Sequence, residues 1–143
     1  MILISRRGFL LSGGAALVAL LAAVPAAHAH ARAPRRAAPG PHPDPRPGIT
    51  GAKVATKEQL RDASALIPLF DAVRNMPEIA DGIRCHCGCA DTPGFRSLLS
   101  CFEGEAMARE CHTCQGQARL AARLKKAGKS LDEIRAAIDA KFG

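Results

Sequence analysis

The sequence predicts an all-α protein: a small helical domain of four to five helices, built around a cysteine cluster and preceded by a Pro-rich linker. Three observations predict it. From residue 49 onward, apolar residues recur at spacings of three and four, as one face of a helix requires. No stretch there shows the sustained polar–apolar alternation that a strand would produce. All six cysteines lie between residues 85 and 114 of the 143-residue chain.

The first 29 residues have the pattern of an export signal. Arg6 and Arg7 precede an apolar run, residues 10–24, which is shorter than the roughly 20 residues needed to span a bilayer. Phe9 and Leu10 after the arginine pair are typical of the twin-arginine class. We therefore expect a periplasmic or extracytoplasmic protein exported by the twin-arginine route. No cysteine lies near the expected cleavage site after Ala29, so no lipid anchor is expected, and membrane attachment would require an uncleaved leader.

Residues 30–48 are predicted to be a linker, because prolines alternate with other residues near its end. Proline lacks an amide hydrogen and fixes φ, so an extended, polyproline-like tether is expected here. His42 is interpreted as part of this tether and not as a metal ligand. The alternating prolines are Pro39, Pro41, Pro43, Pro45 and Pro47.

The helical domain is predicted to cover residues 49–143. Thr56 and Gln59 fit a capping box, and Pro68 lies inside the helical pattern that follows, which predicts either a kink or a split into two helices. A helical turn is expected over residues 77–83. Thr92 and Pro93 suit the N-cap and first position of a short helix that runs toward residue 102.

The longest helix is predicted over residues 104–127, with Gly128 just beyond its C-terminus. Met107, Cys111 and Cys114 fall on its inward apolar line, which places the two cysteines on one helix face. A second capping box, Ser130 with Glu133, opens the last helix, whose inward residues are Leu131, Ile134, Ile138 and Phe142.

The clustered thiols are the candidate functional groups. A domain of this size with four Phe buries too little apolar surface to be very stable, so we expect the cysteines to contribute to stability as well as to function. Thiolates are soft ligands and select Cu(I), Zn²⁺ or an iron–sulfur cluster. Of these, we favour Cu(I) or Zn²⁺ over an iron–sulfur cluster. The candidate metal ligands are Cys85, Cys87, Cys89, Cys101, Cys111 and Cys114, with His86, His112 and Met107 as weaker candidates.

The primary hypothesis is therefore an exported protein that binds a soft metal ion, in metal buffering or delivery. The alternative is a thiol–disulfide redox protein, in which the thiols that undergo disulfide exchange are those of Cys111 and Cys114 or those of the 85–89 motif. The third is a set of structural disulfides, which an oxidising compartment favours. Gln115 stands where covalent haem attachment would need a histidine, and no strand pattern precedes the Cys-x-x-Cys pair as in a thioredoxin-like fold.

Other function classes are disfavoured. Most of the formal charge of +7 lies before residue 49, and with no Trp or Tyr to stack on bases, nucleic-acid binding is not expected. The sequence contains no paired carboxylates, no serine-nucleophile constellation and no phosphate-binding glycine loop, so a hydrolase or nucleotide enzyme is not expected. The residues favour a non-enzymatic role, although they leave the question of enzymatic activity open. The partners expected are the metal ion and another exported thiol or metal protein.

The cysteine motifs resemble those of a known family. Residues 85–89, Cys-His-Cys-Gly-Cys, Cys101-Phe102, the Cys-His-Thr-Cys at 111–114 and the Gly-Lys-Ser-Leu-Asp-Glu-Ile-Arg at 128–135 look like the PCYCGC-motif, or CYCXC, family of small exported bacterial proteins. The resemblance covers roughly residues 68–143. Arg84 stands where the family has Pro, and His86 where it has Tyr. Because some members carry selenocysteine, the resemblance implies redox or soft-metal chemistry.

The C-terminal third is also similar to the thiol-reductase subunit of cytochrome c maturation. There, Arg-Cys-x-x-Cys-Gln precedes two helices that end in a Gly-Lys-Ser-type turn. Residues 111–115 fit this pattern, with Glu110 in place of the arginine, and the gap between Cys114 and Gly128 is shorter.

Overall fold

The computed structural model describes residues 40–143. The predicted signal, residues 1–29, and the first part of the predicted linker lie outside the described residues. Residues 40–143 form α-helices and short 3₁₀ helices without a strand, apart from one isolated bridge between Val54 and Glu103, which confirms the all-α class. None of the helices in this part of the chain has the length and apolar character needed to cross a bilayer.

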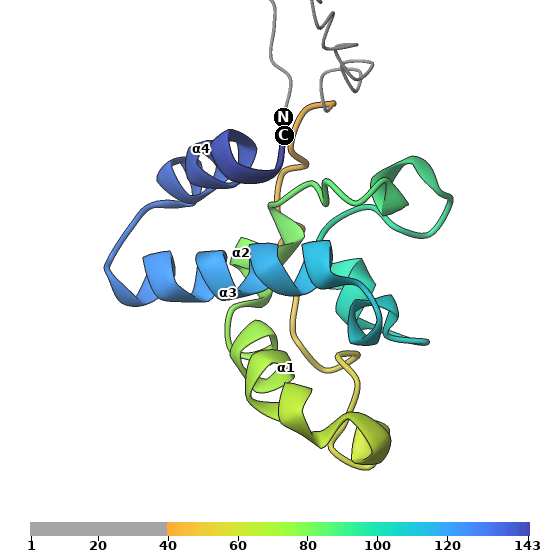
Figure 1. Ribbon diagram of the computed structural model, residues 1–143. Helices are drawn as coiled ribbons and strands as arrows, with labels where there is room; N and C mark the ends of the chain where they lie inside the picture. The colour runs from red at the N-terminus through yellow and green to blue at the C-terminus, as the bar shows by residue number, and fades with distance from the viewer. Residues whose placement is uncertain (1–39) are drawn as a thin grey trace, which may run out of the picture. The chain divides into compact units, whose positions relative to one another are not determined.

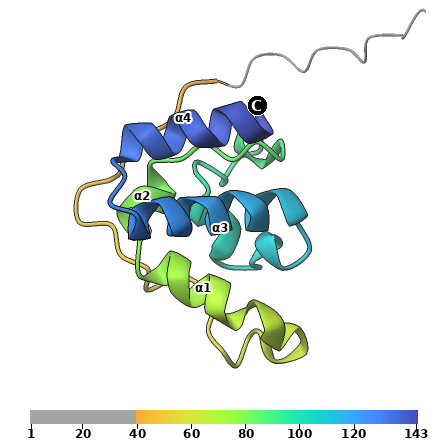
Figure 2. The ribbon, with the colours of Figure 1, turned by 60° about the vertical axis from the view of Figure 1, so that its left-hand side comes forward.

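Helix α3 is the central element (Figures 1 and 2). It contacts α1, α2 and α4, and both views place it between α1 and α4. The α-helices are α1 (Ile67–Arg74), α2 (Pro77–Asp81), α3 (His112–Lys126) and α4 (Leu131–Phe142), and the 3₁₀ helices are η1 (Arg61–Leu66), η2 (Cys89–Asp91), η3 (Leu99–Phe102) and η4 (Met107–Arg109).

Pro68 splits the first predicted helix. The capping box forms, with the Thr56 amide donating to Gln59 Oε1 (2.8 Å) and the Gln59 amide donating to Thr56 Oγ1 (3.3 Å). It leads, however, only into turns and η1, and α1 then begins with Pro68 in its first turn. Proline is accepted there because the first amides of a helix have no intrahelical acceptor.

The helix expected from Thr92 to residue 102 is wrong over most of its length. Thr92 is extended, and only η3 is helical at the end of this segment. Gly94 has φ +94°, a left-handed conformation that stops a helix from continuing. The amide of Leu98 instead donates to the carbonyl of Ile83 (2.7 Å), so a long-range hydrogen bond replaces the local helical one.

The long predicted helix over 104–127 begins eight residues later than expected, since α3 starts at His112. Ala106 has φ +50°, and Cys111 is extended (φ −99°, ψ 102°) and acts as the N-cap. The prediction that Met107 faces inward is also wrong, because this residue is 39% exposed. The predicted end is confirmed: α3 stops at Lys126, and Gly128 follows with φ +75°.

The last helix is confirmed together with its capping box. Ser130 Oγ accepts from the Glu133 amide (3.3 Å), and the Glu133 carboxylate accepts from the Ser130 amide (2.8 Å). Ile134 and Ile138 are fully buried against α3, while Phe142 is partly buried.

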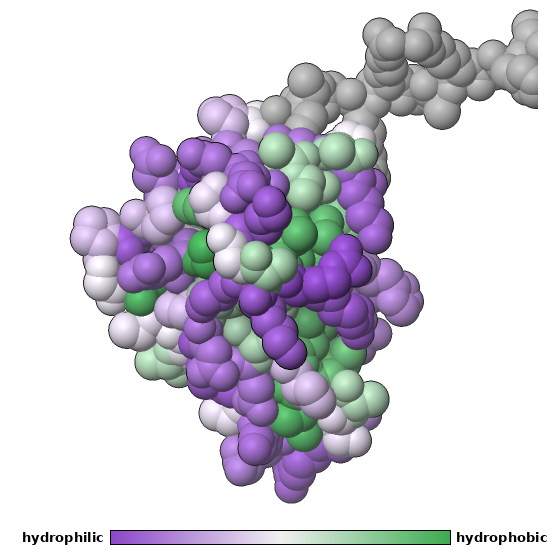
Figure 3. Space-filling model, turned by 90° about the vertical axis from the view of Figure 1, so that its left-hand side faces the viewer, coloured by the Kyte–Doolittle hydropathy of each residue, from purple (hydrophilic) through white to green (hydrophobic). Residues whose placement is uncertain are grey.

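On the face drawn in Figure 3, hydrophilic side chains cover much of the surface and the hydrophobic ones lie between them.

The core lies between α1, α3 and the loops that carry the cysteines. Phe70 of α1 and Phe102 of η3 pack edge to face with ring centroids 4.8 Å apart. Cysteine side chains belong to this core as well, so the candidate site is continuous with the packing that holds the helices together. Other fully buried members include Leu60, Val73, Ile83, Leu98, Leu99 and Ala121.

Residues 40–48 form no helix or strand, but they are bonded to the helices. Asp81, at the end of α2 and fully buried, accepts hydrogen bonds from the Arg46 amide (2.8 Å), from the Arg46 guanidinium (2.8 and 3.0 Å) and from Arg96 (3.1 Å). Arg135 of α4 donates to the carbonyl of Pro43 (2.8 Å) and to that of Gly82 (2.8 Å). These bonds hold the segment against α2 and α4, next to the loop that carries the first cysteines.

Candidate metal centre

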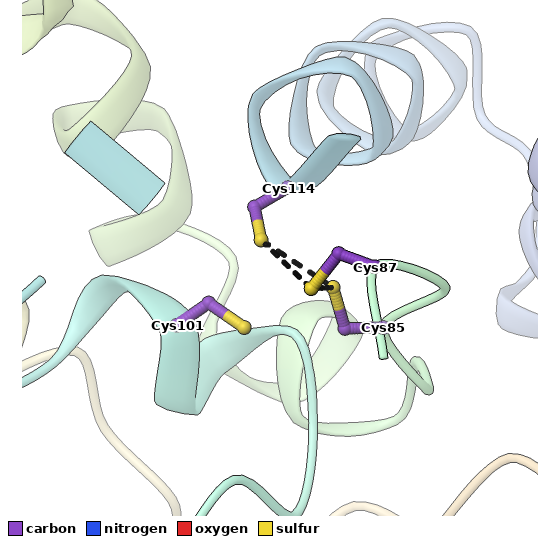
Figure 4. Close-up of side chains that lie close together, drawn as sticks. All are labelled: Cys85, Cys87, Cys101 and Cys114. Atoms are coloured by element: carbon purple, nitrogen blue, oxygen red, sulfur yellow. Dashed lines mark hydrogen bonds between the residues drawn. The ribbon is translucent and has the colours of Figure 1, made fainter. Parts of the chain in front are cut away.

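Four of the six cysteines converge on one point (Figure 4). The Sγ atoms of Cys85, Cys87, Cys101 and Cys114, called here the four-thiol group, all lie within 4.8 Å of one another. The Sγ atoms of Cys85 and Cys87 are 3.3 Å apart, and each lies 3.5 Å from that of Cys114. Three separate segments thus supply one compact set of sulfur atoms.

Each segment reaches the centre for a local reason. Cys85 and Cys87 alternate along the loop after α2, and Gly88, with φ +92°, turns the chain so that Cys89 begins η2. Cys101 lies on η3 and Cys114 in the first turn of α3. Within the group, Cys85, Cys101 and Cys114 are at most 2% exposed, and Cys87 is half-buried.

The spacing of the sulfurs suits an ion shared by all four. Four thiolates around a tetrahedral metal with bonds of about 2.3 Å lie about 3.8 Å from one another. The closest three sulfurs are 3.3 to 3.5 Å apart, slightly nearer than that, and Cys101 completes the group. A disulfide, with a bond of about 2.05 Å, joins only two sulfurs, whereas every sulfur here has three close neighbours. The group could therefore hold a metal ion, and it also places thiols within reach of exchange.

The protonation of the group is uneven. Hydrogen bonds from the thiols of Cys101 and Cys114 lower the pKa of Cys85 to about 3, which makes Cys85 the thiolate of the set. Burial and the hydrogen bond with Cys89 raise the pKa of Cys87. The pKa of Cys114 is raised by its hydrogen bonds to Cys101 and Cys85. For Cys101, the bond to Cys114 lowers the pKa, but the bond to Cys85 and burial outweigh it and the pKa is raised.

The other two predicted cysteines border the group. Cys89 is buried, and its thiol donates to the Met107 Sδ atom at 2.9 Å, while its amide donates to Cys87 Sγ at 3.4 Å. Cys111 is half-buried, and its Sγ accepts from the Cys114 amide at 3.4 Å as the cap of α3. These contacts make Cys89 and Cys111 neighbours of the four-thiol group.

Neither predicted histidine is a member of the four-thiol group. His112 is exposed at the first position of α3. His86 Nε2 lies 2.9 Å from Asp139 Oδ1 of α4, and His42 Nε2 lies 3.0 Å from the same oxygen. His42, His86 and Asp139 therefore form a second group whose ligand atoms lie within 4.8 Å of one another.

The hydrogen bonds of His42 indicate that this second group is a hydrogen-bonded cluster and not a metal site. The Arg84 amide donates to His42 Nδ1 (2.9 Å), so the neutral ring carries its hydrogen on Nε2 and donates it to Asp139. A metal bound to Nε2 would require the other neutral tautomer, with the hydrogen on Nδ1. That N–H would then point at the N–H of the Arg84 backbone, and the hydrogen bond between them would be lost. His42 therefore ties Arg84, next to the first cysteine, to α4.

Sequence reasoning did not identify Gln117 or Asp139. Gln117 is fully buried on α3, and its Nε2 lies 3.9 Å from Cys85 Sγ, close enough for a weak N–H···S contact. The signal that could have found it is its position three residues after Cys114, which places both side chains on one face of the helix. Asp139 carries no such signal, because its partners lie far away in the sequence.

The start of α3 also revises one sequence argument. With the helix predicted to begin at residue 104, the Cys-x-x-Cys pair would lie about two turns inside it, away from the helix N-terminus at which thiol–disulfide oxidoreductases place such a pair. Cys111 is instead the N-cap and Cys114 lies in the first turn, so the pair stands at a helix N-terminus, as in thiol–disulfide oxidoreductases. Because no strand precedes the pair within residues 40–143, the surrounding fold still differs from the thioredoxin type.

Fold and site together define a small all-helical, cysteine-rich protein with a buried four-thiol group. The chain belongs to the family described as "Protein of unknown function with PCYCGC motif", whose sequence profile matches residues 52–143. The motif in that description corresponds to residues 84–89, which here read Arg-Cys-His-Cys-Gly-Cys. No curated protein and no solved structure is significantly similar to the chain.

Proposed function

We propose that the protein is exported by the twin-arginine route and binds one soft metal ion, Cu(I) or Zn²⁺, outside the cytoplasm, where it buffers the ion or delivers it to another exported thiol or metal protein. The observation that carries the proposal is the approach of four Sγ atoms from three segments to within 4.8 Å of one another. Thiolates are the ligands that Cu(I) and Zn²⁺ prefer.

Two further features support binding over catalysis. A metal held by four protein sulfurs has no open position for a substrate, in contrast to catalytic zinc sites, which keep one. Three of the four cysteines are almost completely buried, so the ion would be enclosed by the core. Storage or transfer of the ion fits such a closed ligand set better than chemistry performed on it.

The test is to purify the protein without oxygen, count free thiols and measure bound metal by elemental analysis. Wild type should retain one Cu(I) or Zn²⁺ ion, and Cys114→Ser should lose it. The matched control is Cys111→Ser, because serine is a good N-cap and preserves the bond to the Cys114 amide. Equal metal loss in both variants, or no metal in wild type, would contradict the proposal.

The second candidate function is thiol–disulfide exchange by Cys111 and Cys114. The position of the pair at the start of α3 favours it. In this case Cys111→Ser and Cys114→Ser would abolish a reversible dithiol couple equally, and wild type would retain no metal. If all cysteines instead formed fixed disulfides, the purified protein would contain no titratable thiol before reduction.

A further inference from the structure

A pair of sulfurs lies outside the four-thiol group and reaches the surface. The Cys89 thiol and the Met107 thioether are 2.9 Å apart. They begin two different short helices, η2 and η4, which the fold brings together. We call Cys89 and Met107 the outer sulfur pair.

Packing does not account for the position of Met107. The residue is 39% exposed, and it is the one large hydrophobic residue that is exposed within residues 40–143. The preceding residue, Ala106, has the unfavourable φ of +50°, so the backbone is held in a strained turn where Met107 emerges. Met107 is thus partly exposed to solvent while its sulfur stays in contact with Cys89.

The outer sulfur pair is connected to the four-thiol group. Cys89 is 8% exposed, and its amide donates to the Sγ atom of Cys87 at 3.4 Å. Cys87 is the one member of the group that is not almost completely buried. Met107 is thus the most exposed residue of this set, and the buried Cys89 lies between it and the half-buried Cys87, with contacts to both.

We infer that the outer sulfur pair captures Cu(I) and passes it to Cys87 and the four-thiol group. This inference rests on the proposed function and identifies its metal. A thioether is a neutral, soft ligand that binds Cu(I), whereas Zn²⁺ selects thiolate, imidazole and carboxylate ligands. An exposed methionine at the start of such a path therefore selects Cu(I).

The transfer is an exchange of ligands without electron transfer. Cu(I) binds Met107 Sδ and Cys89 Sγ, and the Cys89 thiol releases its proton to solvent. When the ion moves inward, the Cys87 thiol loses its proton and the Cys89 thiolate takes one up. Copper stays in the +1 state throughout; the transfer itself releases no net proton, and capture and transfer together release one proton per ion.

The test compares the rates of Cu(I) uptake from a Cu(I)–bicinchoninate complex in anaerobic stopped-flow experiments. Met107→Leu keeps the apolar volume and removes the thioether. We expect it to slow Cu(I) uptake about tenfold, a change typical of losing a group near a metal site, and to leave the final amount of bound copper unchanged. Cys89→Ser should slow uptake as well. The matched control is Met76→Leu, since Met76 is buried in the core, and its rate should equal that of wild type.

Zn²⁺ uptake from a chromophoric zinc chelate serves as an internal reference, and Met107→Leu should leave its rate unchanged. If wild type binds copper but Met107→Leu and Cys89→Ser take it up at the wild-type rate, the outer sulfur pair has no role in capture and this inference fails alone. If wild type takes up no Cu(I), the copper assignment of the proposed function fails with it. Equal slowing of Cu(I) and Zn²⁺ uptake in Met107→Leu would overturn the selectivity argument.

Discussion

The Sγ atom of Cys114, in the first turn of α3, lies 3.5 Å from the Sγ atom of Cys85, which is 29 residues earlier in the chain. This contact joins the central helix to the loop after α2. An ion bound here would link both segments to η3 through Cys101. Ion binding and the stability of the fold are therefore expected to be coupled, because the unfolded chain has no preformed set of ligands.

Removal of the metal should destabilise the protein. An ion that binds only the folded state adds about 2.7 kcal/mol to the free energy of unfolding when its free concentration is one hundred times Kd. Thermal unfolding of metal-loaded protein should occur at a higher temperature than that of chelator-treated protein. Cys114→Ser, which lacks one member of the four-thiol group, should show a much smaller difference, and an equal difference in this variant would contradict the coupling.

Metal binding should release about three protons at neutral pH. The pKa of Cys85 is lowered to about 3, so this sulfur is already ionised, whereas the raised pKa values of Cys87, Cys101 and Cys114 keep these thiols protonated. Because protons are released, affinity rises with pH, by up to about a thousandfold per unit for three protons. Calorimetry in buffers of different ionisation enthalpy counts the protons, and a count of four would show that Cys85 is a thiol before binding.

Gln117→Leu should weaken metal binding without weakening the fold. The Gln117 Nε2 group faces Cys85 Sγ at 3.9 Å, while its buried Oε1 has no hydrogen-bond partner within residues 40–143. Removing the contact should lower affinity about tenfold. Replacing a buried, half-satisfied amide by an apolar side chain is nearly neutral or stabilising. Competition with a chelator and denaturant unfolding measure the two effects, and equal losses in both would indicate a purely structural role.

Asp81→Asn should lower stability by about 2 kcal/mol, because hydrogen bonds to a charged group contribute about 1.5–3 kcal/mol. Burial alone would raise the pKa of Asp81, but hydrogen bonds from Arg46 and Ser97 outweigh it and the pKa is lowered. A lowered pKa means that this contribution is complete above the unfolded pKa of about 3.9 and is lost as pH falls through the folded value. Denaturant unfolding between pH 7 and pH 3 should show the loss in wild type.

The control for this prediction is Asp132→Asn, whose carboxylate is 86% exposed. It should retain the stability and the acid sensitivity of wild type. If Asp81→Asn has an acid dependence as steep as that of wild type, other carboxylates cause it.

The parts of the fold that depend on local chemistry could be predicted from the sequence. Both capping boxes form because a hydroxyl and a carboxyl or amide side chain three residues apart satisfy each other's backbone amides. The segment before α3 could not be predicted, since its apolar spacing is helical. There the side chain of Gln115 donates to the carbonyls of Ala108 (2.9 Å) and Arg109 (3.1 Å), and these tertiary bonds stabilise a non-helical path.

The candidate site, like the fold, could be predicted only in the features that depend on local sequence. The clustering of cysteines identifies the chemistry, but the choice of the four that meet depends on two local conformations. One is the turn at Gly88, and the other is the start of α3 at His112, which places Cys111 at the cap and Cys114 toward the group. The role of His42 depends on contacts with Arg84 and Asp139 that are distant in sequence, so no local pattern could reveal it.

The bond from the Arg84 amide to His42 Nδ1 bears on the two positions at which this chain departs from the family motif. A proline at position 84 has no amide hydrogen, so it could not hold His42 in this way. The second departure, His86, shares the Asp139 carboxylate with the same His42. The residues at both positions thus contact His42 or the carboxylate that it shares, and we expect relatives that keep Pro and Tyr at these places to lack both His42 and Asp139.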